Sequence, residues 1–195
     1  MARIVVTEYV SLDGVMEAPG GGEDYVHGGW TFEFDRGAEG EKFKLDEALD
    51  ADALLLGRKT YDGFAAAWPS RDGEFADKFN GMPKYVVSST LTKPEWAHST
   101  LLSGDVVEEI SRLRQAPGGD IVVHGSAQLV QALLEYDLVD ELRLMVFPVV
   151  LGTGKRLFSP TGDKKRLRLA DSKVVGEGIA ILIFKPVSDE ATGSD

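Results

Sequence analysis

The 195-residue chain contains no cysteine, and its three histidines, His27, His98 and His124, are scattered along it. The absence of cysteine excludes a disulfide framework and thiolate metal sites, and the histidines lack the spacing of metal ligands. We therefore predict that the protein has no structural metal. The sequence also lacks the two standard nucleotide-binding fingerprints, the GxGxxG turn and the Walker loop.

Basic residues are outnumbered, because the chain has 21 lysines and arginines against 32 aspartates and glutamates, with a formal net charge of -11. Nucleic acids and anionic membranes both need a basic surface, so neither is expected as a partner. Any anion that the protein binds must be held by a local cluster of cations. No stretch is apolar for the length of a membrane span, and the N-terminus lacks the apolar run of a signal peptide. We expect a cytoplasmic protein with a small-molecule substrate.

A strand–glycine–helix motif occupies residues 53–64, in the sequence ALLLGRKTYDGF. The run Ala53–Leu56 is apolar throughout and predicts a strand that is buried on both faces. The apolar residues that follow recur at helical spacing: Tyr61, Phe64, Ala65 and Trp68. One stripe of this helix can therefore pack back onto the sheet.

The turn of this motif places backbone N–H groups, two cations and a hydroxyl at the start of a helix: Gly57, Arg58, Lys59 and Thr60. Free N–H groups and the helix dipole attract anions, so the turn is a candidate site for a polyanion. Cations are mildly unfavourable at a helix start, which itself favours an anion there. The alternative is an ordinary α/β turn with solvated cations.

The same pattern returns after residue 119. Asp120–Val123 predicts a buried strand, His124-Gly125-Ser126 a tight turn, and Ala127–Glu135 a helix. Two helix N-termini at one edge of a sheet suit a ligand with separated phosphates, and a dinucleotide is the natural candidate. Hydroxyls end the short strand at 84–88 and would lie at the same edge of a parallel sheet, although such residues also form ordinary turns: Ser88, Ser89 and Thr90.

Other runs predict the remaining elements. Strands are expected at Ile4–Val10 and Leu142–Val146, and helices at Glu39–Leu49, at Asp105–Gln115 and, for one turn, at Glu74–Phe79. The inward side of the first of these helices should carry its apolar residues: Phe43, Leu45, Ala48 and Leu49.

Two strand-like runs, Lys165–Val175 and Ile179–Pro186, flank Gly176-Glu177-Gly178 and predict an antiparallel hairpin. We find no linker, repeat or second core. We therefore predict a single α/β domain over residues 1–186, with a mostly parallel sheet and an antiparallel C-terminal hairpin. The polar residues 187–195 are expected to form a disordered tail.

A glycine-rich segment, APGGGEDYVHGGW at residues 18–30, follows the first strand. Its five glycines and few apolar anchors predict a mobile loop. It is either a plain surface connection or a lid over a site at the end of that strand. Trp30, Phe32 and Phe34 could fold over a ligand, although core packing is the use we favour for at least two of them.

Five motifs in a fixed order resemble the dihydrofolate-reductase-like family. They are Ser11-Leu12-Asp13-Gly14, Leu56-Gly57-Arg58-Lys59-Thr60-Tyr61, Val87-Ser88-Ser89, the strand with Gly125-Ser126, and Leu138-Val139-Asp140-Glu141-Leu142 with Pro148-Val149-Val150-Leu151-Gly152-Thr153-Gly154. Within the family, the chain is similar to stand-alone bacterial proteins akin to the reductase domain of the bifunctional riboflavin-biosynthesis deaminase/reductase. The resemblance covers residues 3–186 and implies a three-layer αβα sandwich.

The resemblance implies that the protein binds NADPH and transfers hydride to a pteridine-like or pyrimidine-like substrate. An example is 5-amino-6-(5-phosphoribosylamino)uracil. Arg58 with Ser88, Ser89 and the adjoining Thr90 would hold the adenosine 2'-phosphate. The pyrophosphate would lie between the two turns: Gly57, Lys59 and Thr60 on one side, and Gly125, Ser126, Ala127 and Gln128 on the other.

By the same resemblance, the nicotinamide would lie beside Tyr9, Ser11 and Asp13. Trp30, Met145 and Pro148 would then lie on the substrate side. Met145 stands where typical dihydrofolate reductases have a threonine, which disfavours dihydrofolate as the substrate.

Asp13 and Glu41 are the candidate catalytic carboxylates. Dihydrofolate reductases carry a substrate-binding carboxylate on the helix after the loop, and counting back from Gly57 gives Glu41. Asp46 and Glu47 on the same helix are alternatives. The chain lacks the H-x-E and P-C-x-x-C motifs of the zinc deaminases, so it is not bifunctional.

Three other functions stay open at this point. The chain could be a dihydrofolate reductase proper, a non-catalytic NADPH-binding module, or a reductase that uses a flavin. Relatives of this kind are often dimers, so we also expect a homodimer. The apolar run Leu144–Leu151 could serve its interface, although for Leu144–Phe147 we favour a central strand.

Overall fold

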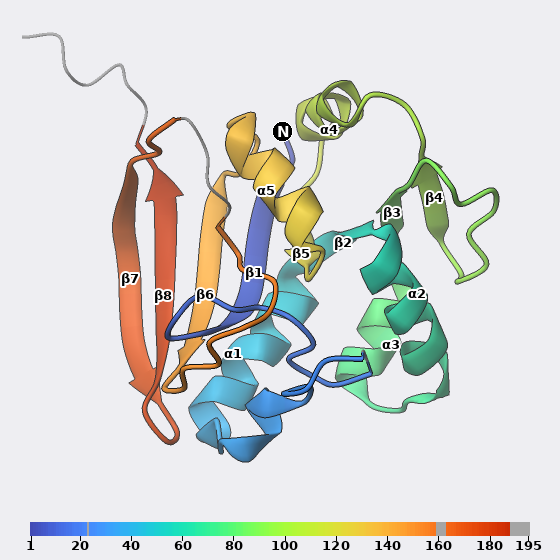
Figure 1. Cartoon of the computed structure of the whole chain (residues 1–195). Helices are drawn as coiled ribbons and strands as arrows, with labels where there is room; N and C mark the ends of the chain where they lie inside the picture. The colour runs from blue at the N-terminus through green and yellow to red at the C-terminus, as the bar shows by residue number, and fades with distance from the viewer. Residues whose placement is uncertain (23, 159–162, 188–195) are drawn as a thin grey trace, which may run out of the picture.

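The computed structural model describes residues 1–22, 24–158 and 163–187 (Figure 1). Its strands form one sheet in the order β4-β3-β2-β5-β1-β6-β8-β7. Neighbouring strands run parallel except for β6–β8 and β7–β8, which are antiparallel. The strands are β1 (Arg3–Ser11), β2 (Ala51–Gly57), β3 (Lys84–Val87), β4 (Ser99–Leu102), β5 (Asp120–His124), β6 (Glu141–Phe147), β7 (Leu167–Val175) and β8 (Ile179–Pro186). The predicted α/β class with a C-terminal hairpin is confirmed.

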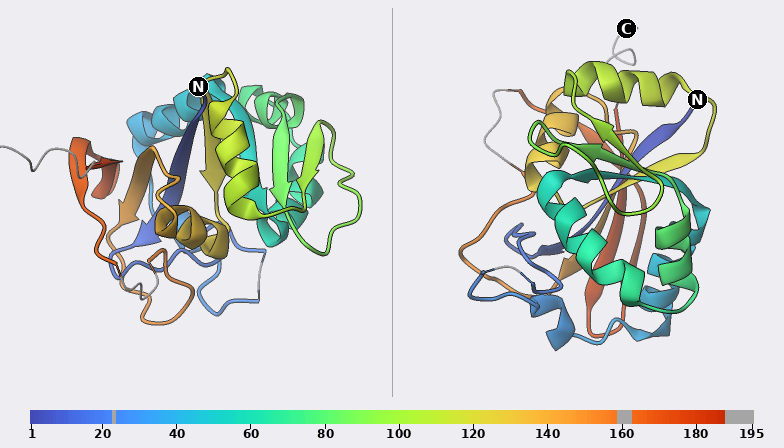
Figure 2. Two further views of the ribbon diagram at one scale, coloured as in Figure 1. Left: turned by 90° about the horizontal axis from the view of Figure 1, so that it is seen from above. Right: turned by 90° about the vertical axis from the view of Figure 1, so that its right-hand side faces the viewer.

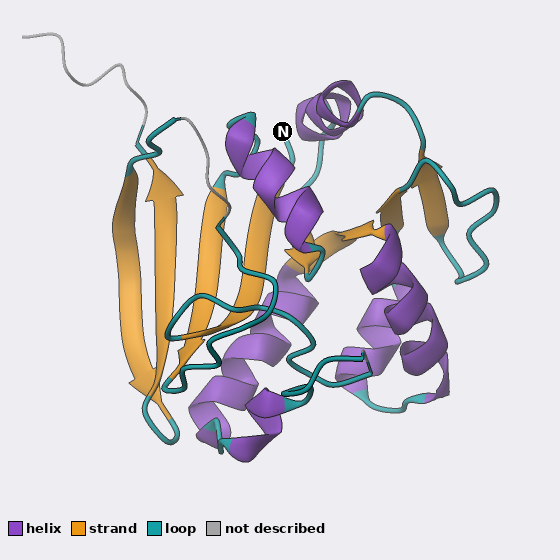
Figure 3. Cartoon of the chain, in the orientation of Figure 1, coloured by secondary structure: helices purple, strands orange, loops and turns teal. Residues whose placement is uncertain are grey.

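Helices cover both faces of the sheet, which gives three layers (Figures 2 and 3). One face is covered by α1 (Gly37–Asp50), α2 (Arg58–Ala67) and α3 (Glu74–Gly81), and the other by α4 (Val106–Gln115) and α5 (Ala127–Glu135). Two short 3-10 turns, η1 (Trp30–Glu33) and η2 (Trp68–Ser70), complete the helical elements that the described residues form. No helix in this described part is long and apolar enough to cross a membrane.

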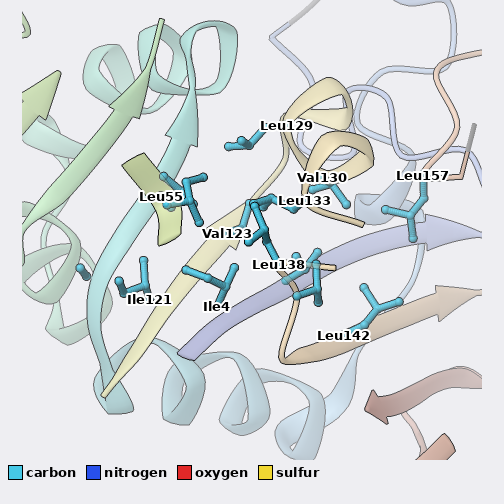
Figure 4. Close-up of a cluster of buried hydrophobic side chains, with 14 of the residues drawn as sticks. Ile4, Leu55, Ile121, Val123, Leu129, Val130, Leu133, Leu138, Leu142 and Leu157 are labelled. Atoms are coloured by element: carbon cyan, nitrogen blue, oxygen red, sulfur yellow. The ribbon is translucent and has the colours of Figure 1, made fainter. Parts of the chain in front are cut away.

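The core of the described part consists of three apolar clusters distributed over the two faces of the sheet, because alternate residues of a strand point to opposite sides. Ile4, Leu55 and Val123 face α4 and α5 and belong to one cluster with Ile110 of α4. Figure 4 shows the three strand residues together with Leu133 of α5. Their neighbours in the strands face α1, α2 and α3: Val5, Leu54, Leu56 and Val122. Strands buried on both faces explain the continuous apolar runs of the sequence.

The structure corrects the predicted inward face of α1. Ala48 is buried as expected, but the other fully buried side chains of this helix belong to Lys44 and Glu47. Phe43, Leu45 and Leu49 are only partly buried. The prediction was wrong because it placed every charged residue of the helix on the solvent side. Lys44 and Glu47 are instead buried, where they form an ion pair with each other and hydrogen bonds to Thr7 of β1.

The sequence also missed β4, a four-residue strand at the edge of the sheet. Only one of its four residues is buried, and the sequence STLL is too short and too polar at its start to indicate a strand. The helix at α3 runs to Gly81 and is longer than the single turn that was expected. β6 lies between β1 and β8, so Leu144–Phe147 forms an inner strand, as favoured. Of the predicted tail, residues 188–195 lie outside the described part.

Candidate functional site

The two strand–glycine–helix turns lie side by side at the carboxyl edge of the sheet. β2 and β5 are parallel neighbours, with Leu55 opposite Val123. The backbone N–H of Gly57 donates to Ser126 Oγ at 2.8 Å, and Ser126 Oγ donates to Thr60 Oγ1 at 2.7 Å. The N-termini of α2 and α5 are therefore joined by a hydrogen-bonded bridge.

Glycine is required on both sides of this bridge. A Cβ atom at position 57 would lie 2.9 Å from Ser126 Oγ, closer than carbon and oxygen pack. Gly125 has a φ of +60°, and Ser126, which precedes α5, has a φ of +62°. This left-handed backbone turns the chain sharply from β5 into α5. The glycines thus bring the two helix starts into contact.

A cleft of about 2090 Å³ opens in front of the two turns. It is lined by the ends of β1, β2, β3 and β5 and by part of the 16–22 loop. Eight lysine or arginine residues and six aspartate or glutamate residues line it, although the whole chain has a net charge of -11. The cleft is therefore locally cationic within an acidic protein, as an anion site requires.

The structure brings most of the predicted cofactor residues together in this cleft. Its lining includes Tyr9, Gly57, Arg58, Lys59, Thr60, Ser88, Ser89, Thr90, Gly125, Ser126, Ala127 and Gln128. Arg58 pairs with Asp62 one turn further along α2 at 2.7 Å, and both side chains are substantially exposed. The Ser88 hydroxyl accepts hydrogen bonds from the N–H groups of Thr90 and Leu91, so it shapes the loop after β3.

Ser11 and Asp13 are not among the residues that line the cleft. The Ser11 hydroxyl donates to Asp13 at 2.6 Å, and Asp13 also accepts from the N–H groups of Leu151 and Gly152. The hydrogen bond from Ser11 is the main cause that lowers the pKa of Asp13 to about 2. Asp13 therefore favours its ionised form, and its hydrogen bonds connect the turn after β1 to residues 151–152. Its predicted catalytic role stays a prediction.

The three predicted substrate residues also lie away from the cleft lining. Trp30 is 1% exposed, packs edge-on against Phe147, and donates through its indole N–H to the carbonyl of Glu17. Met145 is 2% exposed in the same apolar cluster, and Pro148 is exposed. Trp30 therefore packs in the core, as favoured. Phe32, in contrast, is 75% exposed and lines the cleft.

Glu41 lines the cleft but remains largely exposed, with an ion pair to Arg36 at 2.8 Å. Arg36 also donates to the Tyr9 hydroxyl at 2.6 Å, which ties the start of α1 to β1. Asp46 is exposed and pairs with Lys42. Of the three carboxylates considered on this helix, Glu47 is the buried one.

Sequence reasoning missed a buried polar cluster under the cleft. Lys44 Nζ donates to Glu47 at 2.5 Å and to the Thr7 hydroxyl at 2.8 Å. Thr7 donates in turn to Glu47 at 3.1 Å. Glu8 lies beside them on β1 and accepts from the Gly125 N–H at 3.0 Å. One feature of the sequence could have indicated this cluster. Glu8 lies inside a strand that was predicted to be central, and a charged side chain there must be buried with a partner because both faces of the strand are covered.

Burial shifts the pKa values in this cluster in opposite directions. It raises the pKa of Glu8 well above its ordinary value, and the Gly125 N–H only partly opposes this. Burial, together with the charge of Lys44, lowers the pKa of His124 well below its ordinary value. Burial is the largest single influence on Lys44 and would lower its pKa, but Glu47, Tyr9 and Glu8 together outweigh it and the net shift is upward. Lys44 is therefore the fixed cation of the cluster. Glu8 favours its neutral form.

Comparison with known proteins gives one family over almost the whole chain. A family model described as RibD C-terminal domain matches residues 2–181. Protein YyaP of Bacillus subtilis (strain 168), described as uncharacterized, is 28% identical over 187 residues, which cover 93% of this chain and 94% of YyaP.

Solved structures share the fold. A protein from Shewanella sp. PV-4 that is named for riboflavin biosynthesis superposes with a TM-score of 0.75 at 21% identity, over 95% of this chain and 99% of that protein. A pyrimidine reductase-like protein from Corynebacterium diphtheriae gives a TM-score of 0.59 at 13% identity, over 96% of this chain and 92% of that protein. The dihydrofolate-reductase-like sandwich is thereby confirmed.

Proposed function

This chain belongs to the RibD C-terminal domain family, and we propose that it is an NADPH-dependent reductase of a pyrimidine-type heterocycle. The observation that carries the proposal is the bridge between the two helix N-termini, where Ser126 Oγ contacts both Gly57 N and Thr60 Oγ1. A dinucleotide has two linked phosphates that suit two adjacent helix starts. The family favours a reductase that acts on a pyrimidine.

The residues of the cleft fit this cofactor. The first N–H groups of α2 and α5 have no partner within their own helices, and Arg58 and Lys59 lie beside the first set. A guanidinium can hold a phosphate through two hydrogen bonds, so Arg58 would select NADPH over NADH. When bound, the reduced nicotinamide would supply the hydride, while the protein orients the reactants and excludes water.

The family and the charged lining of the cleft support one substrate class. We propose a pyrimidine or its phosphoribosyl derivative, such as 5-amino-6-(5-phosphoribosylamino)uracil. Further cations line the cleft beyond the two turns, among them Arg71, Lys155 and Arg156. Such cations could contact the phosphate of a phosphoribosyl substrate, which a plain pteridine lacks.

Arg58→Ala is expected to weaken NADPH binding at least about tenfold, or about 1.4 kcal/mol, while NADH binding stays unchanged. The reason is that Arg58 would contact the 2'-phosphate, which NADH lacks. Energy transfer from Trp30, Trp68 and Trp96 to the reduced nicotinamide measures both affinities at low ionic strength.

Arg112→Ala is a matched control, since Arg112 is also an exposed helix arginine that pairs with a carboxylate one turn away. It lies on α4 and should change neither affinity. Equal NADPH affinity in the wild type and Arg58→Ala would exclude this phosphate site. If the wild type bound neither nucleotide, the fold would stand and the reductase proposal would fail.

A further inference from the structure

Glu8 is a buried carboxyl group at the cleft with one oxygen unsatisfied. The residue is 5% exposed, lies on β1 between β5 and β6, and lines the cleft. Its Oε2 accepts from the Gly125 N–H at 3.0 Å. Its Oε1 is buried and has no hydrogen-bond partner among the described residues. A buried polar atom without a partner is costly, so a group that arrives with a ligand is the natural partner.

The groups packed around Glu8 favour its neutral form. From α1, Lys44 favours the Glu8 carboxylate, but its partner Glu47, at 2.5 Å, opposes this effect. From β5, His124 favours its neutral form, and on β6 the residue opposite Glu8 is the apolar Leu144. Burial is the dominant influence on the carboxyl group itself. These surroundings raise the pKa of Glu8 and favour a proton on the carboxyl group, and Oε1, which has no hydrogen-bond partner among the described residues, is the oxygen free to carry it.

We propose that Glu8 is the general acid of this reductase and gives its Oε1 proton to the heteroatom of the bond that is reduced. This inference rests on the proposed function. It is independent of which heterocycle is bound, because reduction of a neutral C=N or C=O bond by hydride requires one proton to give a neutral product.

The step balances without a further reactant. The carbon of the C=N or C=O group receives hydride, with its two electrons, from the reduced cofactor. The π electrons pass to the nitrogen or oxygen, which forms an N–H or O–H bond with the proton from Glu8. Oxidised cofactor, reduced substrate and the Glu8 carboxylate result. The Gly125 N–H and Lys44 stabilise that carboxylate until water returns a proton.

The other candidate carboxylates are less suited to this task. Asp13 lies outside the cleft lining and has a pKa of about 2. Glu41 is largely exposed and paired with Arg36. Glu47 is engaged by Lys44, Thr7 and Arg143. In enzymes whose carboxylic acids donate a proton near neutral pH, an apolar environment likewise raises the pKa of the acid.

The first test is the turnover of Glu8→Gln with NADPH and 5-amino-6-(5-phosphoribosylamino)uracil. Glutamine keeps the shape and can still accept from the Gly125 N–H, but it has no acid proton. We expect kcat to fall about 10²-fold or more, with the NADPH affinity unchanged. The wild-type rate should also fall at alkaline pH, and the residual rate of the variant should not. Glu108→Gln, at an exposed carboxylate on α4 that is not among the residues lining the cleft, should keep the wild-type pH profile.

The second test needs no substrate and follows the unfolding free energy of the ligand-free protein with pH. The folded pKa of Glu8 is raised, so the folded state holds more protons than the unfolded state above about pH 4.5. The stability that Glu8 contributes is complete below that pH and is lost as pH rises through the folded pKa. His124 acts in the opposite direction below about pH 6.5, but it is common to both proteins and cancels in the difference. Glu8→Gln should therefore gain stability relative to the wild type as pH rises.

These outcomes separate the two proposals. Equal kcat values in the wild type and Glu8→Gln would overturn the assignment of Glu8 as the general acid but not the proposed reductase function. A stability difference that does not change with pH also overturns it, because Glu8 would then be ionised in the folded state. A wild type that binds no NADPH, or that binds it without turnover, overturns the proposed function and this assignment with it.

Discussion

Replacing Lys44 by methionine is expected to lower the free energy of unfolding by about 3–5 kcal/mol, because a buried carboxylate loses its counter-ion. The side chains of Lys44 and Glu47 are only 8% and 3% exposed, and their charged atoms lie 2.5 Å apart. Thr7 hydrogen-bonds to both. Arg143 reaches Glu47 only at 3.5 Å, so it replaces little of the lost interaction. Urea unfolding of each variant, extrapolated to water, measures the loss.

Two further variants separate the lost charge from the lost packing. Lys42→Met makes the same change two residues earlier on α1, where the pair with Asp46 is exposed, and should cost less than about 0.5 kcal/mol. Lys44→Met/Glu47→Gln removes the stranded charge and should recover part of the stability. A loss below about 1 kcal/mol in Lys44→Met would mean that Arg143 already compensates Glu47.

Most of the fold could be predicted because its signals are local. The helix Ala127–Glu135 was predicted with the bounds that the structure has, since a tight glycine turn and a regular apolar stripe delimit it. The two turns could also be assigned to one edge, because parallel strands all end on the same side of the sheet. The hairpin of β7 and β8 followed from two extended runs around a glycine turn.

The buried polar cluster could not be predicted in the same way. The burial of Lys44 and Glu47 depends on contacts with Thr7 and Arg143, which lie on β1 and β6, far away in the sequence. The spacing of apolar residues predicts that a charged residue is exposed to solvent, unless the residue that pairs with it is already known. The burial of Glu8 could not be predicted for the same reason. Its carboxyl group accepts a hydrogen bond from the Gly125 N–H, and from the sequence that N–H group was expected to bind phosphate. Long-range pairing of charges is the information that the local pattern lacks.

Gly125→Ala is expected to destabilise the protein by about 2–4 kcal/mol and to weaken NADPH binding at least about tenfold. The residue has a φ of +60°, which is strained for alanine, and its added Cβ would lie 2.8 Å from Thr60 Oγ1 and 3.1 Å from Thr60 Cγ2. Thr60 also accepts the hydrogen bond from Ser126. The overlap therefore separates the two helix N-termini, which must stay together to hold linked phosphates. Urea unfolding and the tryptophan energy-transfer titration measure the two effects.

The same substitution at Gly63 is the control, because that glycine lies on α2 with nothing within 4 Å of an added Cβ. It should stabilise the helix by about 0.5–1 kcal/mol and leave NADPH binding unchanged. Gly125→Ala/Thr60→Ala removes the overlapping atoms, so it should regain stability relative to Gly125→Ala. It should not regain full affinity, since the bridge from Ser126 is lost. Wild-type NADPH affinity in Gly125→Ala would show that the two turns do not hold the cofactor as one unit.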